Sequence, residues 1–496
     1  MNSLILMVEK VKLFFLVALL SLGYANAQIN SSITDSLFST SLNENRRIKI
    51  VLPSVYSETN KELYGVIYVL DGEWYTELAP NAYNFAKSGG FLPNTIIVLI
   101  SNVYIDGINQ RNRDFEPYVD KNGSKLFLSF LEKELLPYID KKYPNNGQKN
   151  LLGSSLGGLF AVHTFLTNPD LFQAYVACDP NLDWEKESLA KLAETKLPTL
   201  ETKKTILFIA TNDYSFETNG GKKFNNILQT KAPKSIHWQL KTYQNETHYS
   251  VQYKAFYDGL KYIYSGCWPE KFDFAPRGGF IEKGKPIRLF VANKNPSVSY
   301  TLDGTDPTEK SPRFAPDQAI IISKPATLNV KTIATRDQYK DSLNAFFYPI
   351  DRHKLKSEQI KDTSTVHLSL SSSWDELPST NVAETVHKSQ TNLDSQQANK
   401  STNAVAIIKK TLKVDTDSYY VFVIDAPGGS RLYVDHALLI NSTTNLDYRM
   451  QSFAVYLKKG SYKVTAQLRQ IHNGRQPVMR IFRTTTSNDK WWENEL

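Results

Sequence analysis

The residues Gly153-Ser154-Ser155-Leu156-Gly157 decide the fold that this sequence predicts. A short strand from Asn150 to Leu152 is expected before them, and a helix from Gly158 to Leu166 is expected after them. A G-x-S-x-G pattern between a strand and a helix is typical of a sharp turn, because its two glycines remove Cβ atoms where the chain turns and packs closely. The sequence therefore predicts that the Ser155 hydroxyl is held exposed above the edge of a β-sheet.

Short β-branched runs alternate with longer helical segments from about residue 46 to residue 264. Several runs are apolar on both faces, as in the central strands of a parallel sheet that helices cover. Helices are expected over Lys125–Tyr143 and Val251–Tyr264. The expected strands are Arg46–Leu52, Tyr64–Leu70, Thr95–Ile100, Ala174–Cys178, Thr205–Ala210 and His237–Tyr243. With the serine turn, this alternation predicts an α/β-hydrolase fold with a mostly parallel sheet.

A serine hydroxyl becomes a good nucleophile when a neighbouring base removes its proton. We expect His248 to be that base, because it lies in the polar loop Asn245–Ser250 between the last predicted strand and the closing helix. His163 falls inside the helix after the turn and His237 begins a strand, so both are expected to be packing or surface residues.

The third member of such a triad is a carboxylate that bonds to the histidine. In this fold the order along the chain is serine, acid, histidine, so the acid is expected after the strand Thr205–Ala210. We favour Asp213 because it is closest to the end of that strand. Glu217 is the alternative acid, and Asp183 is a third candidate.

The oxyanion of a tetrahedral intermediate needs backbone N–H donors that already point at it. One is expected at Leu156, directly after the serine. The second is expected at Glu73, in the turn that follows the apolar strand ending at Leu70. No cluster of cysteine and histidine has the spacing of zinc ligands, so neither a metal nor another cofactor is predicted.

Four segments of residues 46–264 carry a resemblance to a known family. They are residues 68–72 (YVLDG), 111–117 (RNRDFEP), 153–157 (GSSLG) and 246–251 (ETHYSV). On these segments the region resembles the esterase D-type family of α/β hydrolases, which includes feruloyl, acetyl-xylan and siderophore esterases and the mycobacterial mycolyltransferase antigens. The resemblance implies a serine hydrolase of carboxylic esters with Ser155, His248 and an acid as its triad. Two positions differ from the family pattern: Tyr249 stands where a glycine often follows the histidine, and residues 178–181 (CDPN) replace a serine-rich segment.

The sequence pattern changes after Cys267. Helical periodicity ends, and short segments with the alternation of strands follow in a region rich in Pro, Gly, Lys and Thr. The hydrolase domain is therefore expected to span residues 28–268. Two small all-β sandwich modules are expected at residues 269–350 and 366–496, with a linker at 351–365.

Both β modules resemble known modules. Residues 276–279 (PRGG) and 300–307 (YTLDGTDP) resemble the C-terminal module of chitobiase and hexosaminidase relatives. Residues 374–378, 429–435 and 459–462 resemble the protective-antigen-type β-sandwich, which often binds glycans. Residues 425–428 (DAPG) stand where glycan-binding members carry paired aspartates, so calcium-dependent binding is not predicted.

Residues 1–27 have the pattern of a secretory signal peptide. Lys10 and Lys12 precede the apolar run Leu13–Leu20, and Ala25-Asn26-Ala27 follows as a small-x-small cleavage site. The run is shorter than the roughly 20 residues of a membrane span, so no membrane anchor is expected. The mature protein is therefore expected to be secreted or periplasmic.

The composition bears on nucleic-acid binding and on disulfide formation. The net charge is +8, but the basic residues are scattered among acids without a basic, aromatic face, so no nucleic-acid partner is expected. Cys178 and Cys267 are the two cysteines, and the sequence leaves open whether they pair.

Taken with the resemblance, these observations predict an exported serine esterase. The expected substrate is an acylated or feruloylated glycan, which the β modules would help to bind. A siderophore ester, as in a catecholate trilactone, is the alternative substrate. A third hypothesis of another class is a glycan-binding protein without catalysis.

Overall fold

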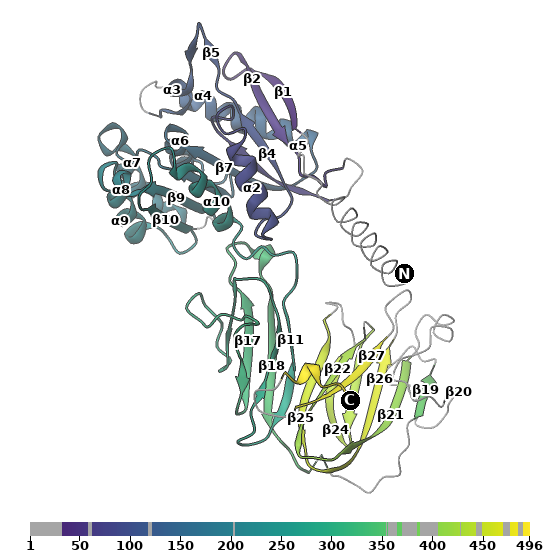
Figure 1. Ribbon diagram of the computed structural model, residues 1–496. Helices are drawn as coiled ribbons and strands as arrows, with labels where there is room; N and C mark the ends of the chain where they lie inside the picture. The colour runs from purple at the N-terminus through teal and green to yellow at the C-terminus, as the bar shows by residue number, and fades with distance from the viewer. Residues whose placement is uncertain are drawn as a thin grey trace, which may run out of the picture. The chain divides into compact units, whose positions relative to one another are not determined.

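The chain folds into two compact units. The computed structural model describes residues 32–57, 62–117, 122–201, 204–353, 355, 365–369, 384–386, 405–426, 428–442, 449–469, 477–484 and 490–496. The first unit, here the hydrolase unit, ends at Pro269, and the second, the β unit, begins at Glu270 (Figure 1). The signal peptide predicted at residues 1–27 and most of the linker predicted at 351–365 lie outside the described residues.

An eight-stranded sheet forms the centre of the hydrolase unit. In spatial order its strands are β1 (Ser32–Ser39), β2 (Glu44–Val51), β4 (Thr95–Ile100), β3 (Tyr64–Val69), β7 (Asn145–Ser154), β8 (Ala174–Cys178), β9 (Ile206–Asn212) and β10 (His237–Tyr243). The strands from β4 across to β10 are parallel, and β1 and β2 are antiparallel. The predicted mostly parallel sheet is confirmed. Strand β1 was not predicted, because its polar and largely exposed sequence SITDSLFS has no apolar run.

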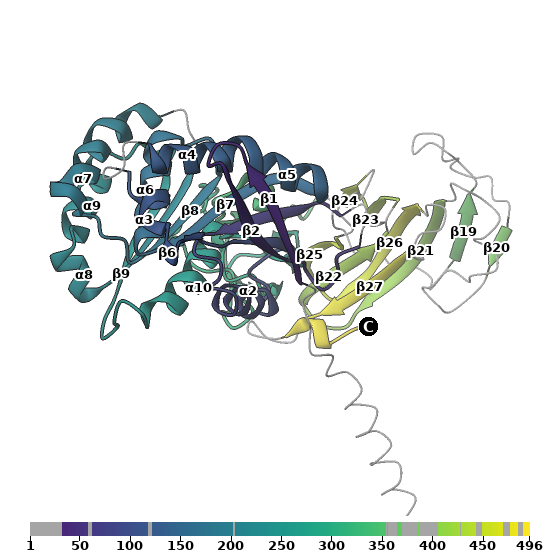
Figure 2. The ribbon, with the colours of Figure 1, turned by 90° about the horizontal axis from the view of Figure 1, so that it is seen from above.

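Helices cover both faces of this sheet (Figure 2). The helices α4 (Gly123–Phe130), α5 (Leu136–Lys142) and α6 (Leu156–Thr167) lie on one face, and α2 (Leu78–Ser88) and α10 (Val251–Ile263) lie on the other. The remaining helices are α3 (Arg111–Phe115), α7 (Trp184–Lys196), α8 (Asp213–Thr218) and α9 (Gly221–Lys231). The helix predicted over Lys125–Tyr143 is α4 and α5 joined by a π-helical turn, Leu131–Leu135. Together the layers confirm the predicted α/β-hydrolase fold.

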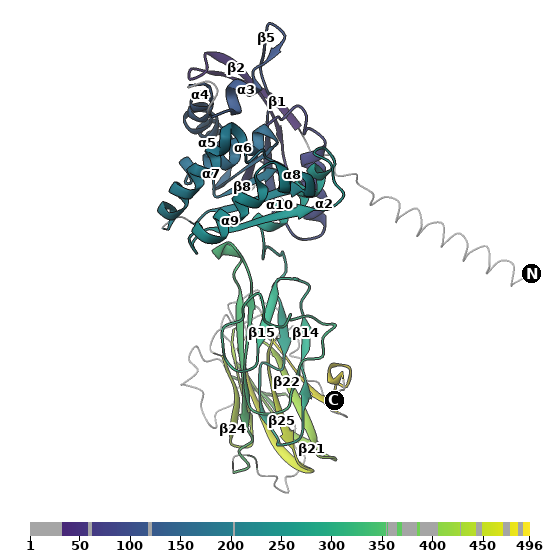
Figure 3. The same cartoon turned by 90° about the vertical axis from the view of Figure 1, so that its left-hand side faces the viewer.

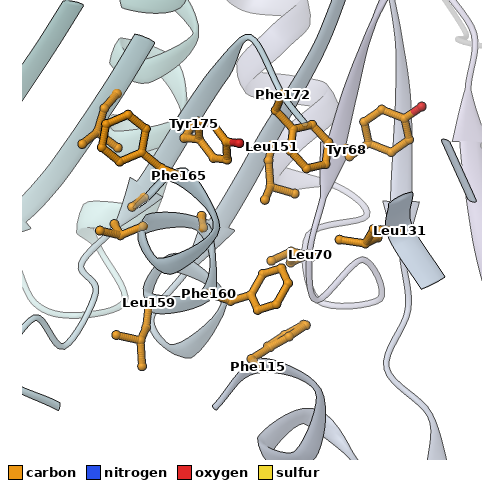
Figure 4. Close-up of a cluster of buried hydrophobic side chains, with 14 of the residues drawn as sticks. Tyr68, Leu70, Phe115, Leu131, Leu151, Leu159, Phe160, Phe165, Phe172 and Tyr175 are labelled. Atoms are coloured by element: carbon orange, nitrogen blue, oxygen red, sulfur yellow. The ribbon is translucent and has the colours of Figure 1, made fainter. Parts of the chain in front are cut away.

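Aromatic side chains hold α6 against the sheet (Figure 4). The rings of Phe165 on α6 and Tyr175 on β8 meet edge to face with centroids 5.7 Å apart. Phe172 lies 5.7 Å from Tyr175 and 5.8 Å from Tyr68 on β3, again edge to face. Such pairs stabilise a core beyond the area that they bury. The helix that follows the serine turn is therefore packed firmly on the sheet.

The β unit contains two larger sheets. The seven-stranded sheet has the order β15 (Val298–Thr301), β17 (Ala326–Thr332), β18 (Ser342–Pro349), β12 (Gly278–Ile281), β25 (Gln451–Leu457), β22 (Ser418–Asp425) and β27 (Val478–Arg483). The six-stranded sheet has the order β20 (Glu384–Val386), β19 (Thr365–Ser369), β21 (Val405–Val414), β26 (Gly460–Arg469), β23 (Ser430–Val434) and β24 (Ala437–Ser442). Strands from both predicted modules run side by side in this unit (Figure 3).

Strand β12 joins the two predicted modules into one sheet. It pairs with β18 of the first module and with β25 of the second, in parallel on both sides. A Cβ atom at Gly279 would lie 2.9 Å from the Ala454 carbonyl oxygen, and one at Gly278 would lie 3.1 Å from the Phe346 carbonyl oxygen. The two glycines therefore let this strand fit between its neighbours. The regions expected as separate modules share one structural unit.

Two further observations concern the described residues. Cys178 is buried, Cys267 is half-buried, and the two are not joined by a disulfide. Within the described ranges, no helix is long and apolar enough to cross a membrane.

Candidate functional site

Ser155 occupies the sharp turn between β7 and α6. Its backbone has φ 56° and ψ −118°, in a region that residues other than glycine rarely adopt. A Cβ atom at Gly153 would lie 2.2 Å from the Gly157 carbonyl oxygen, and one at Gly157 would lie 3.1 Å from the Asp71 carboxylate. The Ser155 N–H donates to the Cys178 carbonyl oxygen at 2.8 Å, which ties the turn to β8. The glycines on either side of Ser155 thus stand where the backbone approaches its neighbours.

The turn lies where the strand order of the sheet reverses. β4 lies beside β3 on one side, and β8, β9 and β10 follow β7 on the other. In open parallel sheets, the loops at the carboxyl ends of strands diverge at such a reversal and leave room for a ligand. Ser155 follows β7 at this point, and the turn from Leu70 to Trp74 follows β3.

His248 comes from the loop between β10 and α10. Asn245, at the start of this loop, has φ 58°. The Thr247 N–H donates to the Ser250 hydroxyl at 2.8 Å, and the Ser250 N–H donates to the Thr247 hydroxyl at 3.0 Å. This reciprocal pair fixes the loop just before α10. The side chain of His248 is 39% exposed, so its imidazole is accessible to solvent.

The imidazole of His248 bonds to Asp179. Its Nδ1 lies 2.6 Å from Oδ2 of Asp179, whose side chain is fully buried. The same Oδ2 accepts from Asn212 Nδ2 at 2.8 Å and from the Ser215 hydroxyl at 3.1 Å. These donors hold the carboxylate in one orientation. A carboxylate at Nδ1 favours the tautomer with its proton on that nitrogen, which leaves Nε2 as an acceptor.

The expected pairing of Asp213 with His248 is corrected by this geometry. Asp213 directly follows β9 as the first residue of α8, and Asp179 directly follows β8, but the carboxylate that bonds to His248 is that of Asp179. Glu217 lies further along α8, is 59% exposed, and has an oxygen 3.4 Å from the Lys222 ammonium. Asp183 stands at the start of α7 and is exposed. None of these three carboxylates is the partner that the structure gives to His248.

A signal in the sequence could have pointed to Asp179. The strand before it is apolar throughout and is buried at every position. An acidic residue directly after such a strand lies at the carboxyl edge of the sheet, where Ser155 also lies. The order serine, acid, histidine holds for Ser155, Asp179 and His248 as well. The prediction failed because it took the acid from the end of β9 and not from the end of β8, which lies beside the strand that leads to Ser155.

The two predicted oxyanion donors flank the serine turn. Leu156 begins α6, so its N–H belongs to the first turn, where helical amides have no intrahelical acceptor. Glu73 lies in the turn after β3, and its carboxylate accepts from the Asn102 backbone N–H at 3.0 Å and from Asn102 Nδ2 at 2.9 Å. These bonds anchor the turn after β3 to the segment that follows β4.

An ion pair between half-buried Arg111 and fully buried Asp71 links the turn after β3 to the serine turn. Asp71, with φ 55°, accepts from Arg111 Nε at 2.6 Å and Nη2 at 3.0 Å. Arg111 Nη2 also donates to the Ser154 carbonyl oxygen at 3.2 Å. Burial raises the pKa of Asp71, and the Arg111 guanidinium opposes that shift. The guanidinium lies 5.2 Å from the ring centroid of Trp74. Arg111, which the sequence singled out only by resemblance, thus connects both sides of the site.

Three family matches cover most of the chain. Residues 39–260 match the esterase family, residues 276–345 match the chitobiase/β-hexosaminidase C-terminal domain, and residues 361–481 match the PA14 domain. The resemblances inferred from the sequence motifs are therefore confirmed.

Part of this chain is similar to known proteins. The ferri-bacillibactin esterase BesA of Bacillus subtilis is 28% identical over 178 residues, which are 32% of this chain and 62% of that protein. A siderophore triacetylfusarinine C esterase of Aspergillus fumigatus is 30% identical over 158 residues, 30% of this chain and 53% of that protein. The match thus spans less than two thirds of either relative. The solved structure of an IroE-like serine hydrolase from Shewanella oneidensis is 30% identical, covers 47% of this chain and 80% of its own, and has a TM-score of 0.43.

The site and the matches agree on the first part of the chain. The serine turn, the histidine loop and the ion pair between Arg111 and Asp71 all lie within the matched residues 39–260. This chain therefore carries an esterase-family domain of α/β-hydrolase fold, followed by a chitobiase/β-hexosaminidase C-terminal region and a PA14 region.

Proposed function

We propose that this protein hydrolyses carboxylic esters through an acyl-enzyme on Ser155. The observation that carries the proposal is the 2.6 Å bond between His248 Nδ1 and the buried Asp179 carboxylate. It prepares Nε2 of His248 to accept a proton from the Ser155 hydroxyl. Asp179 orients the imidazole and stabilises its charged form.

The reaction proceeds in two halves with the same groups. The Ser155 oxygen bonds to the ester carbonyl carbon while its proton passes to His248 Nε2, and the amides of Leu156 and Glu73 donate to the oxyanion. His248 then gives the proton to the departing alcohol as the ester C–O bond breaks. In the second half, water loses its proton to His248 and bonds to the acyl carbon. The bond between the acyl carbon and the Ser155 oxygen then breaks as His248 returns its proton to that oxygen, and the acid leaves.

We propose an acylated or feruloylated glycan as the substrate. The support is the pairing of an esterase-family domain with two regions that match families found in glycan-processing proteins. The predicted signal peptide at residues 1–27 would deliver the enzyme to the periplasm or the medium, where such polymers are met.

A siderophore ester is the second candidate substrate. The observation that favours it is the similarity of part of this chain to the ferri-bacillibactin and triacetylfusarinine C esterases. Both candidates use the same nucleophile and base, so only the measured substrate preference separates them.

A hydrolysis screen of the full chain tests the proposal. The substrates are a short-chain p-nitrophenyl ester, acetylated xylan, a feruloylated arabinose oligosaccharide and a catecholate trilactone, with Ser155→Ala as the blank. We expect hydrolysis of the aryl ester and a higher kcat/KM on a glycan ester than on the trilactone. A preference for the trilactone would establish the second candidate. If even the aryl ester is not hydrolysed, the esterase proposal fails and the hypothesis of a glycan-binding protein without catalysis takes its place.

A further inference from the structure

A cavity of about 210 Å³ lies in the β unit, outside the candidate esterase site. Its floor is one face of the seven-stranded sheet. Val423 and Asp425 alternate along β22, and Val478, Arg480 and Phe482 alternate along β27, so all five point to the same side. Val423 stands opposite Arg480 and Asp425 stands opposite Val478 in the strand register. Asp425 and Arg480 are therefore diagonal neighbours, within reach of each other across one small area.

Aromatic rings from two other segments form the wall of this cavity. Phe290 comes from β14 (Phe290–Ala292), and Trp491 and Trp492 come from a 3₁₀-helical turn, Trp491–Glu493. The rings of Phe290 and Trp492 have centroids 5.2 Å apart, and those of Trp491 and Trp492 are 5.6 Å apart. Trp491 is buried, and its indole N–H donates to the Arg288 carbonyl oxygen at 2.8 Å. Trp491 is thus a fixed part of the wall, and the half-buried Trp492 stands in front of it.

The rim of the cavity reaches solvent and carries both signs of charge. Met450, at the rim, is 43% exposed. The Arg480 side chain is 58% exposed, and its Nε lies 3.7 Å from a carboxylate oxygen of Glu495, which is also exposed. An exposed pair at that distance is worth little, so Arg480 can turn its donors toward a ligand. Asp425 supplies acceptors beside it.

We propose that this cavity binds a neutral pyranose ring of a glycan. The C–H face of a pyranose packs against aromatic rings, and its hydroxyls both donate and accept, as Asp425 and Arg480 together require. A purely apolar ligand would cover these two charged groups and offer them no hydrogen bond. A charged ligand would meet one group of its own sign. The volume suits a single ring, since pockets for drug-sized molecules measure roughly 300–1,000 Å³.

The proposed sugar site is made by both β regions together. Ala275 and Phe290 come from the region matched to the chitobiase/β-hexosaminidase C-terminal domain or its flank, and the floor comes from β22 and β27 of the PA14 region. The site is therefore a product of the sheet that β12 joins. It does not depend on which ester Ser155 cleaves.

Binding of unesterified hexasaccharides to the full chain tests this inference. The probes are xylohexaose, cellohexaose, mannohexaose and N-acetylchitohexaose, followed by calorimetry and by tryptophan fluorescence. We expect at least one to bind, with its affinity lowered tenfold or more by Trp492→Ala and severalfold by Arg480→Ala. Arg480 is exposed, so this second variant keeps the test valid should Trp492→Ala misfold.

Tyr348→Ala is the matched control. Tyr348 is 50% exposed on the same sheet, but its register places it on the opposite face from the cavity. Its loss should leave affinity unchanged, and all three variants should hydrolyse p-nitrophenyl acetate at the parent rate if the esterase proposal holds. No binding of any hexasaccharide at millimolar concentration would overturn the inference. Equal weakening by Tyr348→Ala and Trp492→Ala, or binding only of an apolar dye in a Trp492-dependent manner, would overturn it as well.

Discussion

Arg111 donates hydrogen bonds to both carboxylate oxygens of Asp71 and, from the same guanidinium, to the carbonyl oxygen of Ser154. One side chain therefore sets the spacing between the turn after β3 and the serine turn, the two segments that carry the proposed oxyanion donors. A lysine keeps the charge but has no planar fork that can make these three bonds at once. Arg111 is thus a positioning residue of the proposed reaction.

Arg111→Lys should lower kcat on a small aryl ester by about 10-fold to 100-fold, because a displacement of about 1 Å in a catalytic group can cost that much. KM should change little. Arg113→Lys on the same short helix is the control, since Arg113 bonds to Glu44 and Asp114 and not to the site. Parent kcat in Arg111→Lys, or an equal fall in both variants, would refute the positioning role.

Ser155→Ala should lower kcat for ester hydrolysis by several orders of magnitude, since it deletes the proposed nucleophile. His248→Ala should lose a comparable amount, because nucleophile and base act as one unit. Ser154→Ala, which changes the neighbouring serine in the same turn, should retain turnover within a few-fold. Steady-state kinetics measure the turnover of each variant, and circular dichroism shows whether each variant is folded. Near-parent turnover in a folded Ser155→Ala variant would remove it as the nucleophile.

The acid is tested by amide substitutions at three positions. Asp179→Asn should lower kcat by about 10⁴-fold, because an amide at Nδ1 favours the wrong tautomer of His248. Asp213→Asn and Glu217→Gln should stay within a few-fold of the parent. The pH profile of kcat/KM gives a second readout, since the loss in Asp179→Asn should not be recovered between about pH 6 and 9. The larger loss at Asp213 would return the assignment to the residue expected from the sequence.

Asp114→Ala should destabilise the hydrolase unit by about 3–5 kcal/mol. The Asp114 and Arg46 side chains are both fully buried and lie 2.7 Å apart. Among the described residues, the substitution leaves the Arg46 guanidinium with Glu44 as its remaining carboxylate partner. Lys222→Ala removes an exposed pair and should change stability by less than about 1 kcal/mol. Urea titration followed by both fluorescence and activity assigns the transition to the hydrolase unit. Equal midpoints for the two variants would contradict the prediction.

Two truncations should behave differently. A chain that ends at Pro269 stops at the boundary between the two units and should keep its rate on a soluble aryl ester. A chain that ends at Arg352 keeps β12 but removes β25, so one edge of β12 loses its partner. Unpaired edges promote aggregation. We expect the chain that ends at Arg352 to be less soluble than either the full-length protein or the shorter chain, as measured by soluble yield and light scattering.

The sequence predicted the hydrolase fold because its signals are local. β8 and β10 were predicted with the bounds that the structure has. Each is a short segment of residues that favour strands, and residues typical of turns follow it. The serine turn and the histidine loop were identified for the same reason: their glycines and polar residues lie within a few positions of the residue that matters.

The acid and the shared sheet were missed because both depend on strand order in space. Asp179 and His248 lie 69 residues apart, and only the arrangement of β7, β8 and β9 shows which carboxylate faces the loop after β10. Strand β12 is four residues long and contains two glycines, so its sequence has no strand pattern that could identify β25 as a partner.

The place of β12 in its sheet has a consequence for synthesis of the protein. The Arg277 N–H bonds to Ser452, 175 residues further along the chain. At translation rates of roughly 5–20 residues per second, β25 emerges on the order of 10–30 s after β12. All the strands of the hydrolase sheet have been made before β12 appears, so that sheet can form without any part of the β unit. The β unit cannot complete its seven-stranded sheet until β25 and β27 have been made, and until then β12 has one unpaired edge at which nascent chains can associate.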